Sequence, residues 1–153
     1  MKTVTLLTSA VVLLLSIPAF AEEPEVALGV ARSAGSNVVQ GEVDFDWLGL
    51  QAGVGRPYYG GDGSITGQLG ARAYLTRRPL APYLGVIYSH EAYPSTTPGG
   101  DPRMNVFAGP TLGLRWKTPS RLSFYGELQS MVPGFTADAP IPLRAGLGIQ
   151  YFF

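Results

Sequence analysis

The sequence predicts an all-β fold, a closed barrel of eight antiparallel up-and-down strands that crosses a membrane. Apolar and polar residues alternate along segments of roughly ten residues, which indicates strands. Gly (20 residues), Pro (13) and aromatic side chains (11%) are abundant, as is typical of many short strands joined by turns. On the clearest strands one face carries every charge and the other carries none. That asymmetry separates a membrane barrel from a soluble one.

Residues 1–21 have the features of a cleaved secretory signal peptide. Lys2 supplies the positive start, Leu6–Ile17 is mainly apolar, and Ala19-Phe20-Ala21 is a small-x-small cleavage site. The apolar stretch is shorter than the roughly 20 residues that a membrane-spanning helix needs. We therefore expect a signal peptide at 1–21 and one barrel domain at 22–153.

Turn residues divide the barrel domain into eight predicted strands. These are 25–33, 37–46, 48–58, 64–75, 82–90, 104–117, 121–130 and 142–153. Segments rich in Gly, Pro and Ser separate most of them, and a tight turn near Trp47 separates the second from the third. An even number of strands places both ends of the domain on the same side of the membrane.

The two faces of the strands differ in charge and in side-chain size. On the fourth, sixth, seventh and eighth strands, the 22 residues of the apolar faces include no charge. The 22 residues of the opposite faces are rich in Gly and include Arg72, Arg115, Lys117, Arg121, Glu127 and Arg144. Soluble barrels point large apolar residues inward. Small and charged residues suit a narrow lumen instead, and the apolar faces suit lipid, where a central Arg or Lys costs about 2–4 kcal/mol.

Aromatic residues predict two belts at the membrane interfaces. The belt at one set of strand ends would contain Trp47, Tyr74, Tyr83, Trp116, Tyr151 and Phe153. The belt at the other would contain Tyr58, Tyr59, Tyr88, Tyr93 and Phe135.

The inward charges form the candidate site. The second strand places Gln40, Glu42 and Asp44 on one face. Buried charges must be paired and hydrogen-bonded. We therefore predict a lumen charge network made of Glu42, Asp44, Arg72, Arg115, Glu127 and Arg144. Such a network fills an eight-stranded barrel; the alternative is a small gated pore.

The last strand resembles the terminal strand of bacterial outer-membrane β-barrels. It ends in Phe153, and hydrophobic residues alternate from Leu143 to Tyr151. By length, the chain is similar to the OmpX-like, opacity-protein and OmpA transmembrane barrels. This resemblance implies the outer membrane of a Gram-negative bacterium. It also implies that Ile149, Tyr151 and Phe153 form the signal read by the barrel-assembly machinery.

The resemblance further implies which connections lie on which side. Short turns near Trp47, at 76–81 and at 118–120 are expected in the periplasm. The longer connections Glu91–Arg103 and Met131–Ile141 are expected outside the cell, together with short turns at 34–36 and 60–63.

Few residues indicate catalysis. His90 is the only His, and its neighbour Ser89 must point to the opposite face of the strand. In outer-membrane lipid A deacylases these two residue types lie two apart, on one face. Gly60-Gly61-Asp62-Gly63 lacks the further carboxylates of a calcium loop and the Lys of a phosphate loop, so a hairpin turn is expected. The absence of Cys and the zero net charge argue against thiol chemistry, disulfides and nucleic-acid binding.

We expect a small, non-enzymatic, porin-like outer-membrane barrel without cofactor or metal, with a structural or surface-interaction role. Its expected partners are outer-membrane lipid, the assembly machinery and an unidentified surface ligand. Three alternatives remain at this stage. They are a narrow channel or transporter, a lipid-modifying enzyme centred on His90, and a soluble lipocalin-like barrel that binds a small molecule.

Overall fold

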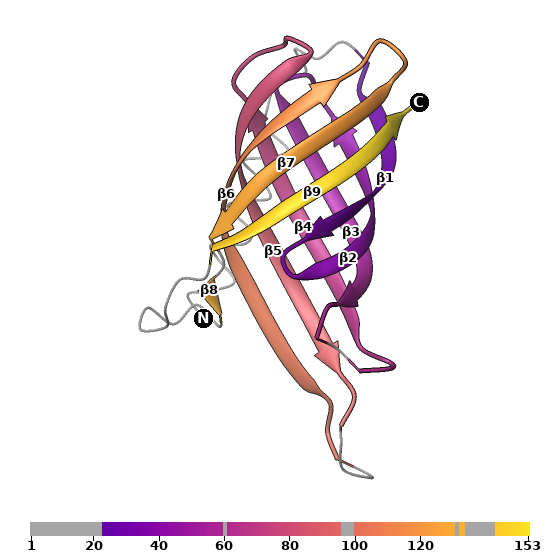
Figure 1. Ribbon diagram of the computed structural model, residues 1–153, viewed down its shortest axis with the longest axis vertical. Coiled ribbons are helices and arrows are strands. Elements are labelled where there is room, and N and C mark those ends of the chain that lie inside the picture. Colours follow the sequence, from indigo (N-terminus) through magenta and orange to yellow (C-terminus); the bar gives the residue numbers. More distant parts are fainter. Residues whose placement is uncertain (1–22, 60, 96–99, 131, 134–142) are drawn as a thin grey trace.

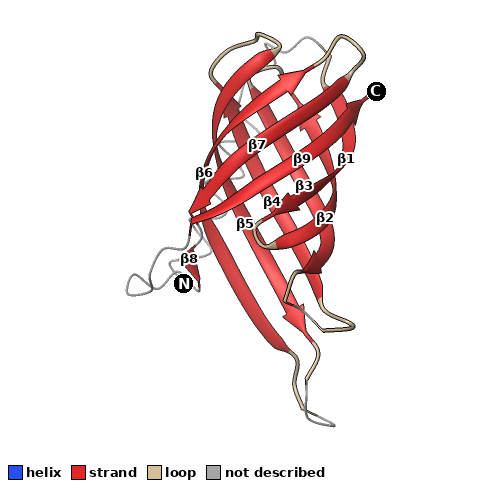
Figure 2. Ribbon diagram, in the orientation of Figure 1, coloured by secondary structure: helices blue, strands red, loops and turns tan. Residues whose placement is uncertain are grey.

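A computed structural model describes residues 23–59, 61–95, 100–130, 132–133 and 143–153. The strands of this part are β1 (Glu25–Ser33), β2 (Ser36–Asp44), β3 (Leu48–Pro57), β4 (Ile65–Tyr74), β5 (Leu80–Tyr93), β6 (Arg103–Lys117), β7 (Leu122–Ser130), β8 (Val132–Pro133) and β9 (Leu143–Phe152). The long strands coil around a common axis (Figures 1 and 2). None of the described residues forms a helix long and apolar enough to cross a membrane. The predicted signal peptide, 1–21, lies outside the described residues.

The sheet closes on itself. Each long strand pairs antiparallel with its neighbour along the chain, and the pairing of β1 with β9 joins the first long strand to the last. Each of the eight long strands of the described chain therefore has a strand on both sides. The predicted closed eight-stranded up-and-down barrel is confirmed. Closure matters because an unpaired backbone group in hydrocarbon costs several kcal/mol.

The largest difference from the predicted strands is the hairpin of β5 and β6. It pairs Leu80 with Trp116 at one end and Tyr93 with Arg103 at the other. The prediction that Glu91–Arg103 is a loop is therefore wrong at both of its ends, and the turn predicted at 76–81 is too long. Pro82 predicts a break but lies inside β5, where its carbonyl accepts a hydrogen bond from the Leu75 N–H. Inside the connection predicted at Met131–Ile141, β8 pairs with β6.

The two ends of the barrel differ in shape. One, here called the terminal end, holds the start of β1, the end of β9 and the turns at 45–47, 75–79 and 118–121. The opposite end, here called the loop end, holds the turn at 34–35, the end of β3, the start of β4 and the facing ends of β5 and β6. The β5–β6 hairpin projects beyond the other strands at the loop end (Figure 1). The β1–β2 turn is tight, with positive φ at Ala34 (49°) and Gly35 (81°).

Side-chain direction follows the predicted alternation. Outward residues such as Leu69, Leu112 and Leu128 are more than half exposed. The described inward positions are mainly polar, charged or glycine, with a few aromatic and small apolar residues among them. The molecule thus has a polar interior and an apolar outer wall.

The aromatic belts need a correction. Trp47, Trp116, Tyr151 and Phe153 are exposed on the outside at the terminal end, as predicted. Tyr74 and Tyr83 instead point into the lumen and are almost fully buried, since each lies at an inward position of its strand. Tyr93 bonds to the inward carboxylate of Glu91. Phe135 lies outside the described residues.

We expect Gly148 to be required by ring packing in the lumen. A Cβ there would overlap the ring of Tyr125 on the neighbouring strand, whereas a Cβ on Gly67 would meet nothing within 4 Å. Overpacking typically costs 1–3 kcal/mol. Gly148→Ala should lower the free energy of unfolding in lipid vesicles, measured by urea titration, by about that amount. Gly67→Ala is the matched control and should change it by less than about 0.5 kcal/mol. Equal effects of the two variants would contradict this account.

Candidate functional site: the charged lumen

Arg72 lies at the centre of the lumen and joins two carboxylates from opposite parts of the sheet. It projects from β4 and is 1% exposed. Its Nη1 lies 2.8 Å from Glu42 Oε2 on β2, and its Nη2 lies 3.2 Å from Glu127 Oε2 on β7. One side chain therefore ties three strands together across the barrel.

Two tyrosines and a glutamine complete the bonding of these carboxylates. The Tyr74 hydroxyl donates to Glu42 Oε1 at 2.6 Å, and the Tyr83 hydroxyl donates to Glu127 Oε2 at 2.6 Å. Gln150 donates to Glu42 Oε2 at 3.0 Å. The predicted network omits these three residues. The alternation of the strands could have identified them, because each lies on the same face of its strand as the polar residues.

Arg115 forms a second layer towards the terminal end. Its Nη1 lies 2.5 Å from Asp44 Oδ2 and 3.5 Å from Glu42 Oε1. The guanidinium also stacks on the Tyr74 ring, with Cζ 3.6 Å from the ring centroid. At the mouth of the barrel beyond it, Lys117 pairs with Glu25.

A third layer lies towards the loop end and consists of amides and hydroxyls. Gln129 donates to Glu127 Oε1 at 2.7 Å and to Ser33 Oγ at 2.8 Å. Its own Oε1 accepts the Ala34 N–H at 2.7 Å. Gln68 donates to the Ser33 carbonyl at 2.9 Å. The β1–β2 turn is thereby fastened onto the contents of the lumen.

The structure places Arg144 apart from the carboxylates with which it was expected to pair. Its guanidinium donates to the Ala34 carbonyl at 2.5 Å and lies 5.0 Å from the centroid of the Phe107 ring. Among the described residues it has no ion pair with Glu42, Asp44 or Glu127. The physical reason is its position along the barrel axis. Arg144 lies opposite Gln129, one inward position beyond Glu127 towards the loop end.

An apolar contact covers the network at the loop end. Ala34 and Ile87 are buried together, and Phe107 packs against them. Arg144 lies against both the turn and the ring. From the terminal end to the loop end, the described lumen therefore contains two charged layers, an amide layer and this apolar cover.

The lipid-modifying alternative has no geometric support at His90. Ser89 points inward, is fully buried and lies 3.2 Å from the hydroxyl of Thr66. His90, next in the strand, occupies the outward face opposite Gly67. The two cannot form a nucleophile–base pair. Within the part of the chain that the structure describes, no three His, Asp or Glu residues group as a metal site.

The predicted assembly-signal residues share the outer face of β9. Ile149, Tyr151 and Phe153 are all exposed, and the rings of Tyr151 and Phe153 meet edge to face at 5.3 Å. The structure thus places the three side chains together on one exposed face.

Comparison with known proteins supports the fold. The N-terminal β-barrel domain of Pseudomonas aeruginosa OprF aligns over 85% of this chain and 96% of its own, with a TM-score of 0.63 and 16% identity. Neisserial surface protein A aligns over 85% of this chain and 94% of its own (TM-score 0.47, 16% identity). A major outer membrane protein from Thermus thermophilus aligns over 86% of this chain and 100% of its own (TM-score 0.46, 18% identity). No family model matches the chain, and no curated protein matches it.

The outer wall agrees with a membrane location. Its outward side chains are mainly apolar along the long strands, and an exposed apolar surface of this extent marks contact with lipid or protein. The OprF domain, whose fold this chain shares, is a barrel of the type expected from the sequence. The chain is thus a membrane-type β-barrel, as predicted, and the location expected for it is the bacterial outer membrane.

We expect Arg72 to be the most costly lumen residue to remove. Arg72→Met leaves Glu127 buried without a cation and leaves Glu42 only Arg115, at 3.5 Å. Breaking a buried ion pair typically costs 3–5 kcal/mol. Urea unfolding in vesicles should show a loss of about that size. Arg78→Met, at an exposed turn position, is the control and should be nearly neutral. An Arg72→Met barrel as stable as the control would show that the network does not hold the barrel together.

Proposed function

We propose that the protein is a small, non-enzymatic outer-membrane barrel with a closed lumen and a structural or surface-interaction role. The observation that carries this proposal is the Arg72 bridge to Glu42 and Glu127. It uses the charges of the lumen to hold strands together. Groups engaged in this way are not free to bind a solute.

The part best suited to surface contact is the projecting β5–β6 hairpin. It extends past the barrel at the loop end (Figure 1), and Arg103, Met104 and Asn105 on it are exposed. The start of β1 and the end of β9 lie at the terminal end. In the topology expected for outer-membrane barrels, this hairpin would therefore face outside the cell. This hairpin is therefore the part of the protein that a surface ligand would meet first.

The channel alternative predicts a current that this proposal does not. Purified protein in planar bilayers should give no steady unitary conductance, because the ion-pair layers and the Ala34–Phe107 contact fill the lumen. Single-channel recording at moderate voltage measures this. Steady openings whose size changes in Glu127→Gln would favour the pore and contradict the proposal.

The enzyme alternative is tested at His90. Lipid A from cells that express the His90→Ala variant should be identical to lipid A from cells with the unaltered protein, because Ser89 and His90 face opposite sides of the wall. Mass spectrometry of extracted lipid A is the measurement. An acyl modification present with the unaltered protein and lost with His90→Ala would overturn the non-enzymatic assignment.

The soluble lipocalin-like alternative is disfavoured by the direction of the side chains. A soluble binding barrel needs an apolar interior and a polar exterior. In the described strands the arrangement is the reverse.

The barrel-assembly machinery remains a proposed partner, supported by the shared outer face of Ile149, Tyr151 and Phe153.

A further inference from the structure

The outer wall carries charge at one place only among the described strands. Outward positions from β1 to β9 are apolar, small or uncharged, apart from His90 and two arginines, Arg32 on β1 and Arg56 on β3. Both arginines are exposed and both lie at the loop end of their strands. An outward Arg costs about 2–4 kcal/mol at mid-bilayer and 0–1 near the interfaces. Their position therefore marks the level of the lipid headgroups.

The two arginines lie in one row. Arg32 is paired with Asn37 of β2, and Asn37 is paired with Arg56 of β3. Neighbouring strands lie about 4.8 Å apart, so the two backbones are roughly 10 Å apart with an amide between them. Three of the few polar side chains on the outer wall are thus adjacent. Chance scatter along eight strands would not be expected to collect them.

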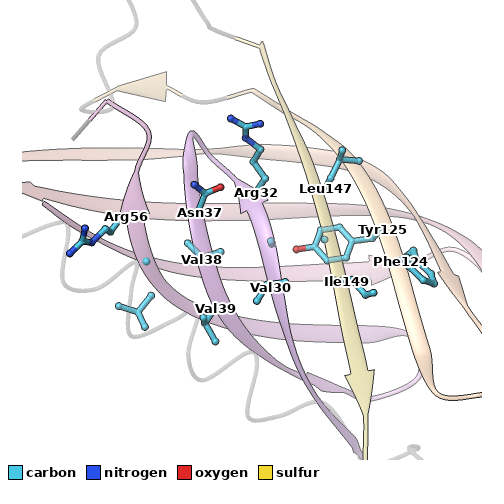
Figure 3. Close-up of a pocket in the computed structure, with 14 residues that line it drawn as sticks. Val30, Arg32, Asn37, Val38, Val39, Arg56, Phe124, Tyr125, Leu147 and Ile149 are labelled. Atoms are coloured by element: carbon cyan, nitrogen blue, oxygen red, sulfur yellow. The ribbon is translucent and has the colours of Figure 1, made fainter. Parts of the chain in front are cut away.

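A groove with an apolar lining runs from this row along the wall. Its volume is about 780 Å³, and Arg32, Asn37 and Arg56 line its polar end (Figure 3). The rest of its outward lining consists of Val30, Val39, Val54, Phe124, Leu147 and Ile149. Val30, Val39 and Val54 are themselves a cross-strand row, one step nearer the terminal end.

The cations of the row are available for an anion. Neither guanidinium forms an ion pair with a carboxylate of the described residues. Tyr58 holds Arg32 in place. The Arg32 Nε donates a hydrogen bond to the Tyr58 hydroxyl, and the Arg32 Cζ lies 4.2 Å from the centroid of the Tyr58 ring. This bond uses only the Nε of Arg32 and does not involve its Nη1 and Nη2. Guanidinium donors suit phosphate oxygens in charge and geometry.

We propose that this groove binds one phosphorylated lipid of the outer leaflet, with a phosphate on Arg32, Asn37 and Arg56 and an acyl chain along the valine row. Charge complementarity selects the anionic headgroup, and the apolar lining selects hydrocarbon. The site lies at the loop end, which is the outer-leaflet side in the expected topology. The site is on the wall, so it is independent of the lumen.

The test uses the full mature barrel in dodecyl maltoside micelles, titrated with bisphosphorylated lipid A, with bound lipid counted by native mass spectrometry. We expect one lipid A per chain. Arg32→Gln/Arg56→Gln should weaken binding at least tenfold, since a charge-assisted bond is worth about one power of ten or more. The control Arg78→Gln/Arg121→Gln removes two exposed arginines at the terminal end and should change binding less than twofold. Heat-modifiable gel mobility confirms that each variant is folded.

Other probes decide what is recognised. Dephosphorylated lipid A should bind the unaltered protein as weakly as lipid A binds the double variant, and inorganic phosphate should not displace lipid A. Equal binding by the double variant and the control would overturn the site. Equal binding of phosphatidylglycerol would overturn its assignment to the outer-leaflet lipid. A dimer that forms without lipid and is lost in the double variant would assign the groove to a second copy instead. None of these results bears on lumen conductance, so this proposal and the closed lumen fail separately.

Discussion

The strands of the described chain direct almost all of their charges into the lumen. The outer wall faces hydrocarbon, where an ion has neither water nor a partner, so the strands carry their ions on the other face. A narrow lumen then forces these ions together. Arg72 satisfies two carboxylates at once, and Arg115 satisfies a third while it approaches the first. The register of the sheet follows from this, because a slip of one residue would turn the network towards lipid.

The same constraint explains the roles of the tyrosines and glycines inside. Tyr74 and Tyr83 add hydroxyl donors to the carboxylates that the arginines pair with, at Glu42 Oε1 and Glu127 Oε2. Two of the large rings occupy space that a glycine on the neighbouring strand leaves open. Tyr83 lies against Gly113, and Tyr125 lies against Gly148. Glycine on the polar face is therefore a packing requirement of the lumen, which accounts for its abundance there.

Sequence reasoning predicted the fold well because period-two alternation is a local property with a direct structural meaning. The eight strands, their order and five of the six residues chosen for the lumen network could be placed in this way. The partner of Arg144 could not be predicted, because it depends on the position of Arg144 along the barrel axis relative to strands far away in the chain. Alternation shows which face a residue is on but not its position along the axis. The ends of the β5–β6 hairpin were missed for a related reason. Pro82 and Glu91 are unfavourable for strands locally, yet here they are held in register by cross-strand pairing.

Two arginines on the outer wall depart from the rule that charges point inward. Arg32 on β1 and Arg56 on β3 break the apolar pattern in one cross-strand row, with Asn37 of β2 between them. A stability account of the lumen does not need them, so their presence has to be explained at the surface. In the two proposals the lumen and the wall have separate roles: the interior holds the barrel closed, and the exterior binds lipid.

The central claim is that one face of each strand meets lipid while the other is sealed inside. Because the chain has no Cys, single cysteines at adjacent positions Gln68 and Leu69 can carry a spin label in turn. Collision of the label with oxygen and with a water-soluble nickel complex is then measured in bilayers. The account predicts that Leu69→Cys collides strongly with oxygen and weakly with nickel, and that Gln68→Cys collides weakly with both. Strong nickel collision at Leu69→Cys would place that face in water and contradict the account.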